Sequence, residues 1–228
     1  NGELVRPLGE YHYPEWATKS MHVRDAITPD SFKIPAEGQE VTARVIEIIP
    51  ERVGSFERHA KLKVQDGQVS SDTAQDVLKT AVFERHHETG KVGFGFVKGF
   101  GIQCGAMAST VAHDAHNLLV IGTNDEDMAL AANTLIACGG GMTAVQNGKV
   151  LGTVPLPIAG LMNDKPLEEM SEIVENLSSA WKQIGCSIVS PFMTMALIPL
   201  ACLPELRLTD RGLVDCTTFQ FVPLFLPN

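Results

Sequence analysis

The chain lacks the features by which several large protein classes are identified. Its longest apolar run, residues 195–203, contains Pro199 and falls well short of the ~20 residues that cross a bilayer. It has 18 Lys and Arg against 27 Asp and Glu, and the basic residues are scattered rather than clustered. Nucleic-acid phosphates and anionic lipids are bound by a basic stripe, so we expect neither a nucleic-acid nor a membrane partner.

Cysteine motifs and targeting segments are also missing. The five cysteines form no CxxC pair, so nothing indicates a zinc ribbon, and free thiols in a reducing cytoplasm are the simplest interpretation. The first residues include neither an initiator Met nor a signal-peptide pattern. We therefore expect a cytoplasmic chain that is a piece of a longer one.

What is present is the composition of a globular protein, with 44% hydrophobic and 20% charged residues among 228, enough to bury a full-sized core. Residues 1–37 show no helical or strand period, and they contain aromatic residues such as Tyr11 and Trp16 followed by two proline turns. We interpret residues 1–37 as a strand and linker that pack against another domain. Residues 38–228 then form one folded domain.

Strand patterns run along most of that domain. Alternating or β-branched runs predict strands at residues 41–49, 62–65, 92–97, 107–111, 118–121 and 219–222. Residues 76–83 fit either a strand or a helix. Asn147-Gly148, between the apolar segments 142–146 and 149–154, is the strongest short-range signal for a β-hairpin.

Two segments predict helices. Thr123 and Glu126 have the spacing of a capping box before an Ala-rich helix, which the triple glycine at 139–141 ends. Pro166 fits the first position of a second helix, and apolar residues recur every three or four positions from Leu167 to Ile184, all on one face. Because strands outnumber helices, we expect an α+β fold with a mostly antiparallel sheet and two clear helices.

The segment richest in chemistry is Ala-His-Asp-Ala-His-Asn at residues 112–117. His113, Asp114 and His116 offer acid–base and metal-ligating groups, and they follow a run of small residues that lets a ligand or another backbone come close. On a strand the two histidines would point to opposite faces, so only a turn or a helix start brings them together. A polar turn, in which Asp114 and Asn117 bond nearby backbone, explains the same residues without a function.

Other motifs are better explained as structure. His86-His87-Glu88 is typical of a solvated strand end before a turn, because adjacent histidines on a strand face opposite ways. The glycines at 93–101 contain no phosphate-loop pattern, and those at 139–141 lie at the C-terminal end of their helix, the wrong end for an anion. Asp210-Arg211-Gly212 is most simply a turn.

The order of several motifs is more specific than any one of them. These are Glu-Arg-His-His at 84–87, GFGFVKGFG at 93–101, STVAHDAHN at 109–117, GTNDEDM at 122–128, GGG at 139–141 and LPIAGLM at 156–162. In this order they strongly resemble the C-terminal region of prokaryotic-type adenine deaminases, of the amidohydrolase superfamily. Residues 1–5 and 16–23 resemble the strand that follows the barrel of those enzymes and the linker after it. The resemblance covers nearly the whole chain.

The resemblance implies a reaction that the motifs alone do not. In that family a (β/α)8 barrel holds a divalent metal (Mn, Fe or Zn), and a metal-activated hydroxide converts adenine to hypoxanthine and ammonia, a step of purine salvage. The barrel and its metal ligands lie outside this chain. The resemblance therefore implies that the chain is inactive alone, that its partner is the N-terminal barrel of the same protein, and that the enzyme is a homo-oligomer.

For residues 112–117 we predict a place over the mouth of the barrel's active site. His113, Asp114 and His116 would assist proton transfer, and Asn117 and Ser109 would contact the purine substrate. The alternative is a non-catalytic structural or oligomerisation domain, in which the same polar groups are buried and hydrogen-bonded to backbone. A third interpretation, an independent metal-binding module, requires the isolated chain to bind metal in stoichiometric amount.

Overall fold

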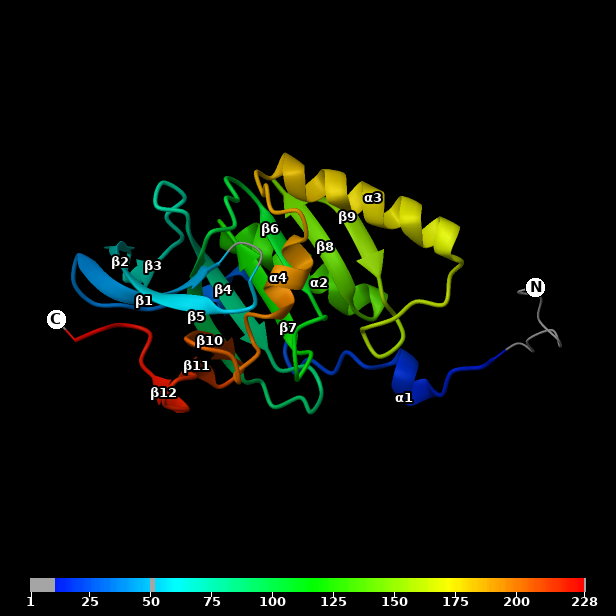
Figure 1. The fold of residues 1–228 in the computed structure, drawn as a ribbon, viewed down its shortest axis with the longest axis horizontal. Helices are drawn as coiled ribbons and strands as arrows, with labels where there is room; N and C mark the ends of the chain where they lie inside the picture. The colour runs from blue at the N-terminus through cyan, green and yellow to red at the C-terminus, as the bar shows by residue number, and fades with distance from the viewer. Residues whose placement is uncertain (1–10, 50–51, 228) are drawn as a thin grey trace.

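A computed structural model describes residues 11–49 and 52–227. Its centre is a nine-stranded sheet with the strand order β3-β2-β1-β5-β4-β7-β6-β8-β9, beside which lies a three-stranded sheet, β10-β11-β12 (Figure 1). Among the described strands only β1 and β5 pair in parallel; every other pairing is antiparallel. The predicted α+β class with a mostly antiparallel sheet is confirmed.

The strands are β1 (Glu40–Ile48), β2 (Ser55–Gln65), β3 (Gln68–Val69), β4 (Val77–Phe83), β5 (Val92–Lys98), β6 (Ala106–Ser109), β7 (Leu118–Gly122), β8 (Gly141–Gln146), β9 (Lys149–Pro155), β10 (Leu206–Thr209), β11 (Gly212–Asp215) and β12 (Gln220–Val222). The helices are α1 (Glu15–Thr18), α2 (Asp125–Cys138), α3 (Leu167–Gln183) and α4 (Pro191–Ala196), with a 3-10 turn at Pro29–Phe32. All the predicted strands are present, and residues 76–83 form the strand β4. The first half of β2, together with β3, β10 and β11, was not predicted.

Both faces of the central sheet are covered. Leu118 and Val120 of β7 pack with α2 on one face, while Leu119 and Ile121 belong to the core that α3, α4 and the small sheet build on the other. The alternation follows from the two-residue period of a strand. Because both faces are buried, β4 and β7 are apolar along most of their length.

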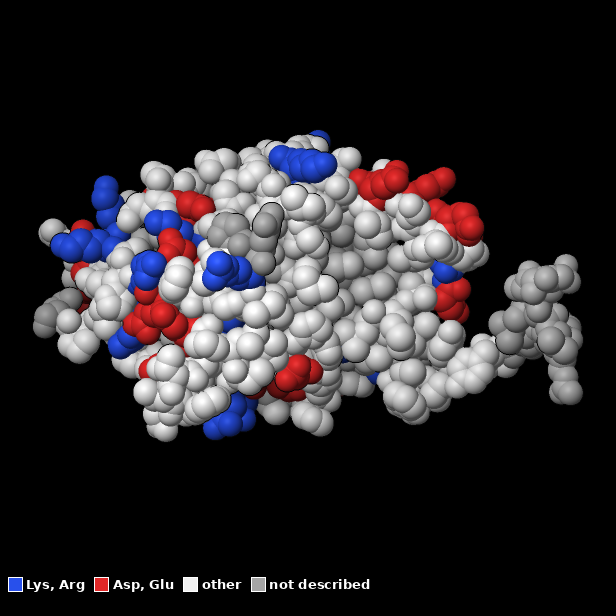
Figure 2. All heavy atoms as spheres, viewed as in Figure 1, with Lys and Arg blue, Asp and Glu red and all other residues white. Residues whose placement is uncertain are grey.

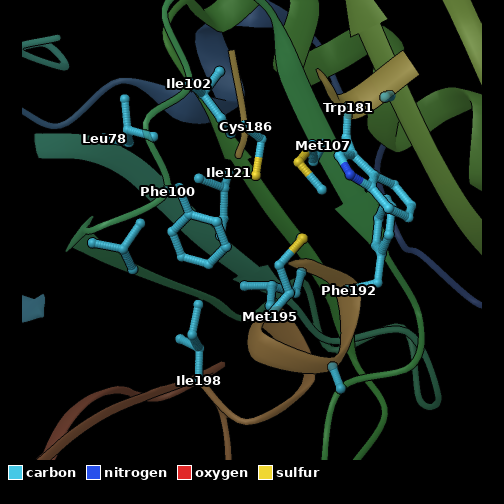
Figure 3. Close-up of a cluster of buried hydrophobic side chains, with 14 of the residues drawn as sticks. Leu78, Phe100, Ile102, Met107, Ile121, Trp181, Cys186, Phe192, Met195 and Ile198 are labelled. Atoms are coloured by element: carbon cyan, nitrogen blue, oxygen red, sulfur yellow. The ribbon is translucent and has the colours of Figure 1, made fainter. Parts of the chain in front are cut away.

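The larger core lies between the sheet and the elements that follow it in the sequence. Met107 and Ile121 of the sheet meet Trp181 of α3 and Met195 of α4 there (Figure 3). The Trp181 and Phe192 rings pack edge to face with their centroids 5.7 Å apart. This core fixes α4 against the loop that joins β6 to β7.

The start of α2 differs from the prediction. The N-cap is Asn124, whose Oδ1 accepts from the Asp127 backbone N–H at 2.7 Å, whereas Thr123 bonds Gly105 instead. The proposed capping box of Thr123 with Glu126 is therefore wrong, because a neighbouring loop takes the threonine hydroxyl. The hairpin is confirmed: Asn147 and Gly148 both have positive φ, as a type I′ turn requires.

The apolar face of α3 is fully buried only in its second half, and Met170 and Ile173 of the first half are partly buried. Leu177 and Trp181 are buried, but Leu167 and Val174 are exposed, and the helix begins after its N-cap, Pro166. The prediction that Pro166 is the first helical residue is wrong by one position. None of the helices in residues 11–49 and 52–227 is long and apolar enough to cross a membrane.

The predicted linker is partly folded onto the domain. Ile27 and Phe32 are buried in the cluster that α2 forms with the sheet. The part of this prediction that falls on residues 1–10 lies outside the described residues. The boundary between residues 37 and 38 stays a prediction.

Candidate functional site

The 110–117 loop joins β6 to β7 and turns tightly at its centre. The His116 backbone N–H donates to the Ala112 carbonyl at 2.7 Å, and His116 itself has a φ of 52°. The His113 backbone N–H donates to the carbonyl of Ala196 at the end of α4. This turn brings the two imidazoles together edge to face, with their ring centroids 5.3 Å apart. On a strand, two histidines three residues apart would point to opposite faces, so the contact depends on the turn.

A backbone hydrogen bond selects one tautomer of the neutral His116 ring. Its Nδ1 accepts a hydrogen bond from the Ala112 backbone N–H at 3.2 Å, so the proton of the neutral ring sits on Nε2. Burial lowers the pKa of His116 below its usual value, and the neighbouring His113 and Arg85 side chains lower it further. His116 is therefore a neutral imidazole at pH 7, able to donate from Nε2.

The other two predicted catalytic side chains are open to solvent or to a partner. Asp114 is exposed and His113 is half-buried. Within residues 11–49 and 52–227, no side-chain hydrogen bond holds either of them. Both are thus available to a ligand, whereas the other two predicted residues already have partners: Asn117 is buried and bonds Arg85 and Asp210, and Ser109 is fully buried and bonds Val111. A contact of either residue with substrate stays a prediction.

A second loop lies against the first. Residues 84–90 follow β4, and the His86 ring Nε2 lies 2.7 Å from the Ala115 carbonyl oxygen. The predicted solvated strand end is confirmed, since residues 86–90 are exposed. Its position beside residues 112–117 was not predicted. Five of the seven histidines, His22, His86, His87, His113 and His116, lie on these loops and the adjoining linker.

Glu84 shapes this second loop. Its carboxylate accepts from the backbone N–H groups of His86, His87 and Thr89 and from the Thr89 hydroxyl. Burial alone would raise the pKa of Glu84, but these four donors outweigh it and lower the pKa to about 2. Glu84 is ionised at neutral pH and fixes the turn that carries His86 and His87.

Arg85 joins three segments that are far apart in the sequence. Its side chain is 1% exposed, and it donates from Nε to the His116 carbonyl at 2.6 Å, from Nη1 to the Ser20 carbonyl at 2.7 Å and from Nη2 to the Ala159 carbonyl at 2.9 Å. Gly160, with a φ of 71°, leaves room for the guanidinium, because a Cβ there would lie 2.8 Å from Nη2. Burial lowers the pKa of Arg85 to about 10, so the group stays charged at pH 7. Sequence reasoning missed this residue, since its partners are main-chain carbonyls.

A cleft of about 260 Å³ opens beside the first loop. Its polar lining includes Asp114, Asn117 and Asp210, and Val82, Ala112 and Pro199 are among the apolar residues. Asp210, interpreted above only as part of a turn, accepts from the Asn117 amide at 3.3 Å. Sites for small molecules usually enclose ~300–1,000 Å³. This cleft is slightly smaller and can form one wall of a site that another domain completes.

The described residues do not fit a metal ion. Among residues 11–49 and 52–227, no group of three or more His, Cys, Asp or Glu side chains is placed to hold one. His113 and His116 come together, but the only carboxylate in their loop is that of the exposed Asp114. The arrangement offers proton transfer and hydrogen bonding rather than metal ligation.

Known proteins resemble this chain over nearly its whole length. The family described as "Adenine deaminase C-terminal domain" matches residues 54–220. A protein named "Adenine deaminase" from Clostridium botulinum (strain Loch Maree / Type A3) is 74% identical over 227 residues, which are 99% of this chain and 38% of that protein. Proteins of the same name are 51% identical in Moorella thermoacetica (98% of this chain, 38% of that protein) and 46% identical in Methanothrix thermoacetophila (91% and 36%). The chain therefore spans less than two fifths of the length of these relatives.

Proposed function

The chain belongs to the adenine deaminase C-terminal domain family, and from this premise we propose that it acts as the C-terminal portion of an adenine deaminase. The reaction is the hydrolysis of adenine to hypoxanthine and ammonia. The observation that carries the proposal is the match of almost the whole chain to relatives of that name. The cytoplasmic location, the part in purine salvage and the assembly into a homo-oligomer belong to the same proposal.

The metal chemistry of the reaction is proposed for the preceding barrel. The described residues provide no donor set for Mn, Fe or Zn, so no step through a metal is assigned to this chain. The chain alone is then inactive. Its own contribution, in our proposal, is to bind and orient the purine and to exchange protons with it.

The 110–117 loop supplies that contribution in our proposal. Deamination requires protons at a purine ring nitrogen and at the departing amine. The neutral His116 can donate from Nε2, because Nδ1 is occupied by the Ala112 N–H. The exposed carboxylate of Asp114 can accept from an amino or ring N–H of the purine. His113, with its ring against that of His116, can exchange the proton with solvent.

The structural alternative rests on a different set of contacts. Arg85, Asn117 and Ser109 are buried and bonded within the chain, as a purely architectural loop requires. Those contacts position the loop in either case. The side chains that separate the two functions are His113, Asp114 and His116: no hydrogen bond within the described residues holds the tips of the first two, and the His116 ring leaves its Nε2 free of the contact that Nδ1 makes with Ala112.

The test uses a full-length chimera, in which this chain replaces the corresponding region of the Clostridium botulinum relative. The chimera should deaminate adenine, and a folded but inactive chimera contradicts the proposal. His113→Ala and His116→Ala should each lower kcat/KM at least ~100-fold, the usual effect of removing an acid–base group. The matched control is His59→Ala, which removes an exposed histidine of β2 and should leave kcat/KM unchanged.

Two outcomes decide between the alternatives. Equal melting temperatures for the chimera and its histidine variants, with a loss of kcat/KM, support a role in the reaction. Kinetics unchanged in both variants, with the fold intact, leave the structural domain as the function. Asp114→Asn, which keeps the shape and removes the charge, should raise KM for adenine.

A further inference from the structure

Exposed apolar side chains gather at one end of the molecule. Leu167 is 79% exposed, Trp16 75% and Met162 57%. Together with Val174, these residues form what we call the apolar strip. Single exposed apolar residues are ordinary, but several on neighbouring segments usually mark an interaction site.

The segments that carry the strip are joined by hydrogen bonds and by sequence. The Ala159 backbone N–H donates to the carbonyl of Ala17 in α1 at 2.5 Å, and Met162 pairs with Ile158 in the same loop. Five residues after Met162, α3 begins. Figure 1 shows α1, this loop and the first turns of α3 at the same end of the long axis. The residues of the strip therefore lie on neighbouring segments at the same end of the molecule.

The strip includes the part of α3 that the sheet leaves uncovered. The helix has an apolar face along its whole length, which is fully buried from Leu177 onward, whereas in the first half Met170 and Ile173 are only partly buried against the core and Leu167 and Val174 are exposed. On its other side the first half carries Glu168, Glu169, Glu172 and Glu175. In the view of Figure 2 acidic side chains line this end of α3, and much of the surface beside them is uncharged. A helix with one acidic and one apolar side is suited to bind a partner with the apolar side.

We infer that the apolar strip is the surface on which the preceding domain of the full-length protein docks. The chain accounts for only 38% of the length of its relatives, and its family is described as their C-terminal domain, so most of the missing length precedes it. Trp16 lies on α1, the first described helix. Trp16 is thus among the described residues of the strip that are nearest in sequence to the missing length. This inference rests on the family assignment and goes beyond the proposed part in the reaction.

The strip and the candidate site are mechanically connected. The loop 157–162 carries Met162 of the strip, and the carbonyl of its Ala159 accepts from Arg85. Arg85 in turn holds the backbone of His116. A domain docked on the strip is thus placed in a fixed position relative to the 110–117 loop.

Photo-cross-linking in the full-length chimera tests the assignment. Leu167, and separately Trp16, is replaced by p-benzoylphenylalanine, and the cross-linked peptides are identified by mass spectrometry after irradiation. Phe221, which is 52% exposed on β12, is the matched control position. We expect cross-links within one chain from 167 and 16 to the preceding domain, and none to it from 221. Cross-links between two copies assign the strip to an oligomer interface, and the absence of any cross-link at both positions makes it free surface. Either result overturns the inference.

A substitution provides a second readout that does not depend on activity. Leu167→Glu places a charge in the strip, and Val189→Glu, at a residue that is 91% exposed elsewhere, is its control. Neither change should lower the melting temperature of this chain alone. In the chimera Leu167→Glu should make the connection between the domains at least 10-fold more sensitive to limited proteolysis, and Val189→Glu should not. Equal sensitivity of the two variants contradicts the inference. Neither experiment measures deamination. A failure of the docking inference can therefore be distinguished from a failure of the proposed function, which is tested by the activity of the chimera.

Discussion

Buried arginines hold the chain together at two places, and the two are built alike. Arg85 is 1% exposed and Arg207 is 2% exposed, and each donates to main-chain carbonyls rather than to a carboxylate. Arg207 bonds the carbonyls of Val53, Leu197, Leu203 and Pro204, and so ties the segment before β10 to the turn before β2. Burial lowers the pKa of both guanidinium groups. Both therefore exchange hydration for several fixed carbonyl dipoles.

The two arginines differ in what they hold. None of the four acceptors of Arg207 has a titratable side chain. Arg85 holds His116 directly, lies between Glu84 and His86 in the sequence, and connects the linker to the loop 157–162. In our proposal, similar buried contacts therefore serve stability alone at Arg207 and also place reactive groups at Arg85. Variants at both positions can separate the two roles.

The largest expected effect is on stability, and it should be alike at the two sites. Arg85→Met and Arg207→Met each remove the side-chain donor from at least three main-chain carbonyls in part-buried hydrogen bonds. At ~1 kcal/mol for each unsatisfied group, both should lower the free energy of unfolding by about 3 kcal/mol. Chemical denaturation of this chain measures both. A loss below ~1 kcal/mol at either position would contradict the statement that both arginines stabilise the fold.

Glu84 should add a pH-dependent stabilisation at the Arg85 site. Its pKa is lowered to about 2 from the 4.5 of a free side chain, so its contribution is complete above pH 4.5 and is lost as the pH falls toward 2. Glu84→Gln should cost about 2 kcal/mol at pH 7, because hydrogen bonds to a charged acceptor are lost. The cost should vanish near pH 2. Denaturation curves at pH 7, 4 and 2 measure it.

Asp215 is the matched carboxylate on the Arg207 side of the molecule. Its pKa is also about 2, owing to the hydroxyls of Thr217 and Thr218, but all of these bonds lie in one local turn. Asp215→Asn should change the acid unfolding less than Glu84→Gln does. A larger effect of the Asp215 variant would show that the Glu84 turn contributes no special stability.

The smallest expected effects come from removing one hydrogen bond beside each arginine. Asn117 accepts from the Arg85 backbone N–H, and Ser55 donates to the Leu206 carbonyl next to Arg207. Asn117→Ala and Ser55→Ala should each cost about 1 kcal/mol. In the full-length chimera only Asn117→Ala should also raise KM for adenine, since it releases the wall of the cleft near Asp210. An equal rise of KM for Ser55→Ala would show that the Arg85 and Arg207 sites do not differ in their effect on substrate binding.

The fold was predictable where neighbouring residues determine it. Asn147-Gly148 fixes the β8–β9 hairpin, the alternating, β-branched run identifies β1, and a short apolar run identifies β7. The first half of β2 escaped prediction because its sequence, Ser-Phe-Glu-Arg-His, is mostly polar and largely exposed, and its partner is the second half of β1. The parallel pairing of β1 with β5 joins residues about fifty positions apart, for which one sequence holds no local signal.

The candidate site was predictable in its residues but not in its assembly. His113, Asp114 and His116 stand out by residue type, and their spacing correctly required a turn. The packing of residues 84–90 against them depends on Arg85, whose partners Ser20, His116 and Ala159 contribute only carbonyl groups. Any residue supplies a carbonyl, so no pattern of side chains indicates this contact. Long-range contacts of this kind emerge only from the folded chain.

The central claim, that the Arg85 site positions groups for the reaction and the Arg207 site does not, is tested most directly by two lysine variants. Arg85→Lys and Arg207→Lys keep the charge and remove the fork of donors at each site. In the full-length chimera, kcat/KM for adenine is measured well below both melting transitions. The account predicts a loss of at least ~10-fold for Arg85→Lys and less than ~2-fold for Arg207→Lys, a difference of about 1 kcal/mol in transition-state stabilisation. Equal values of kcat/KM for the two variants would contradict it.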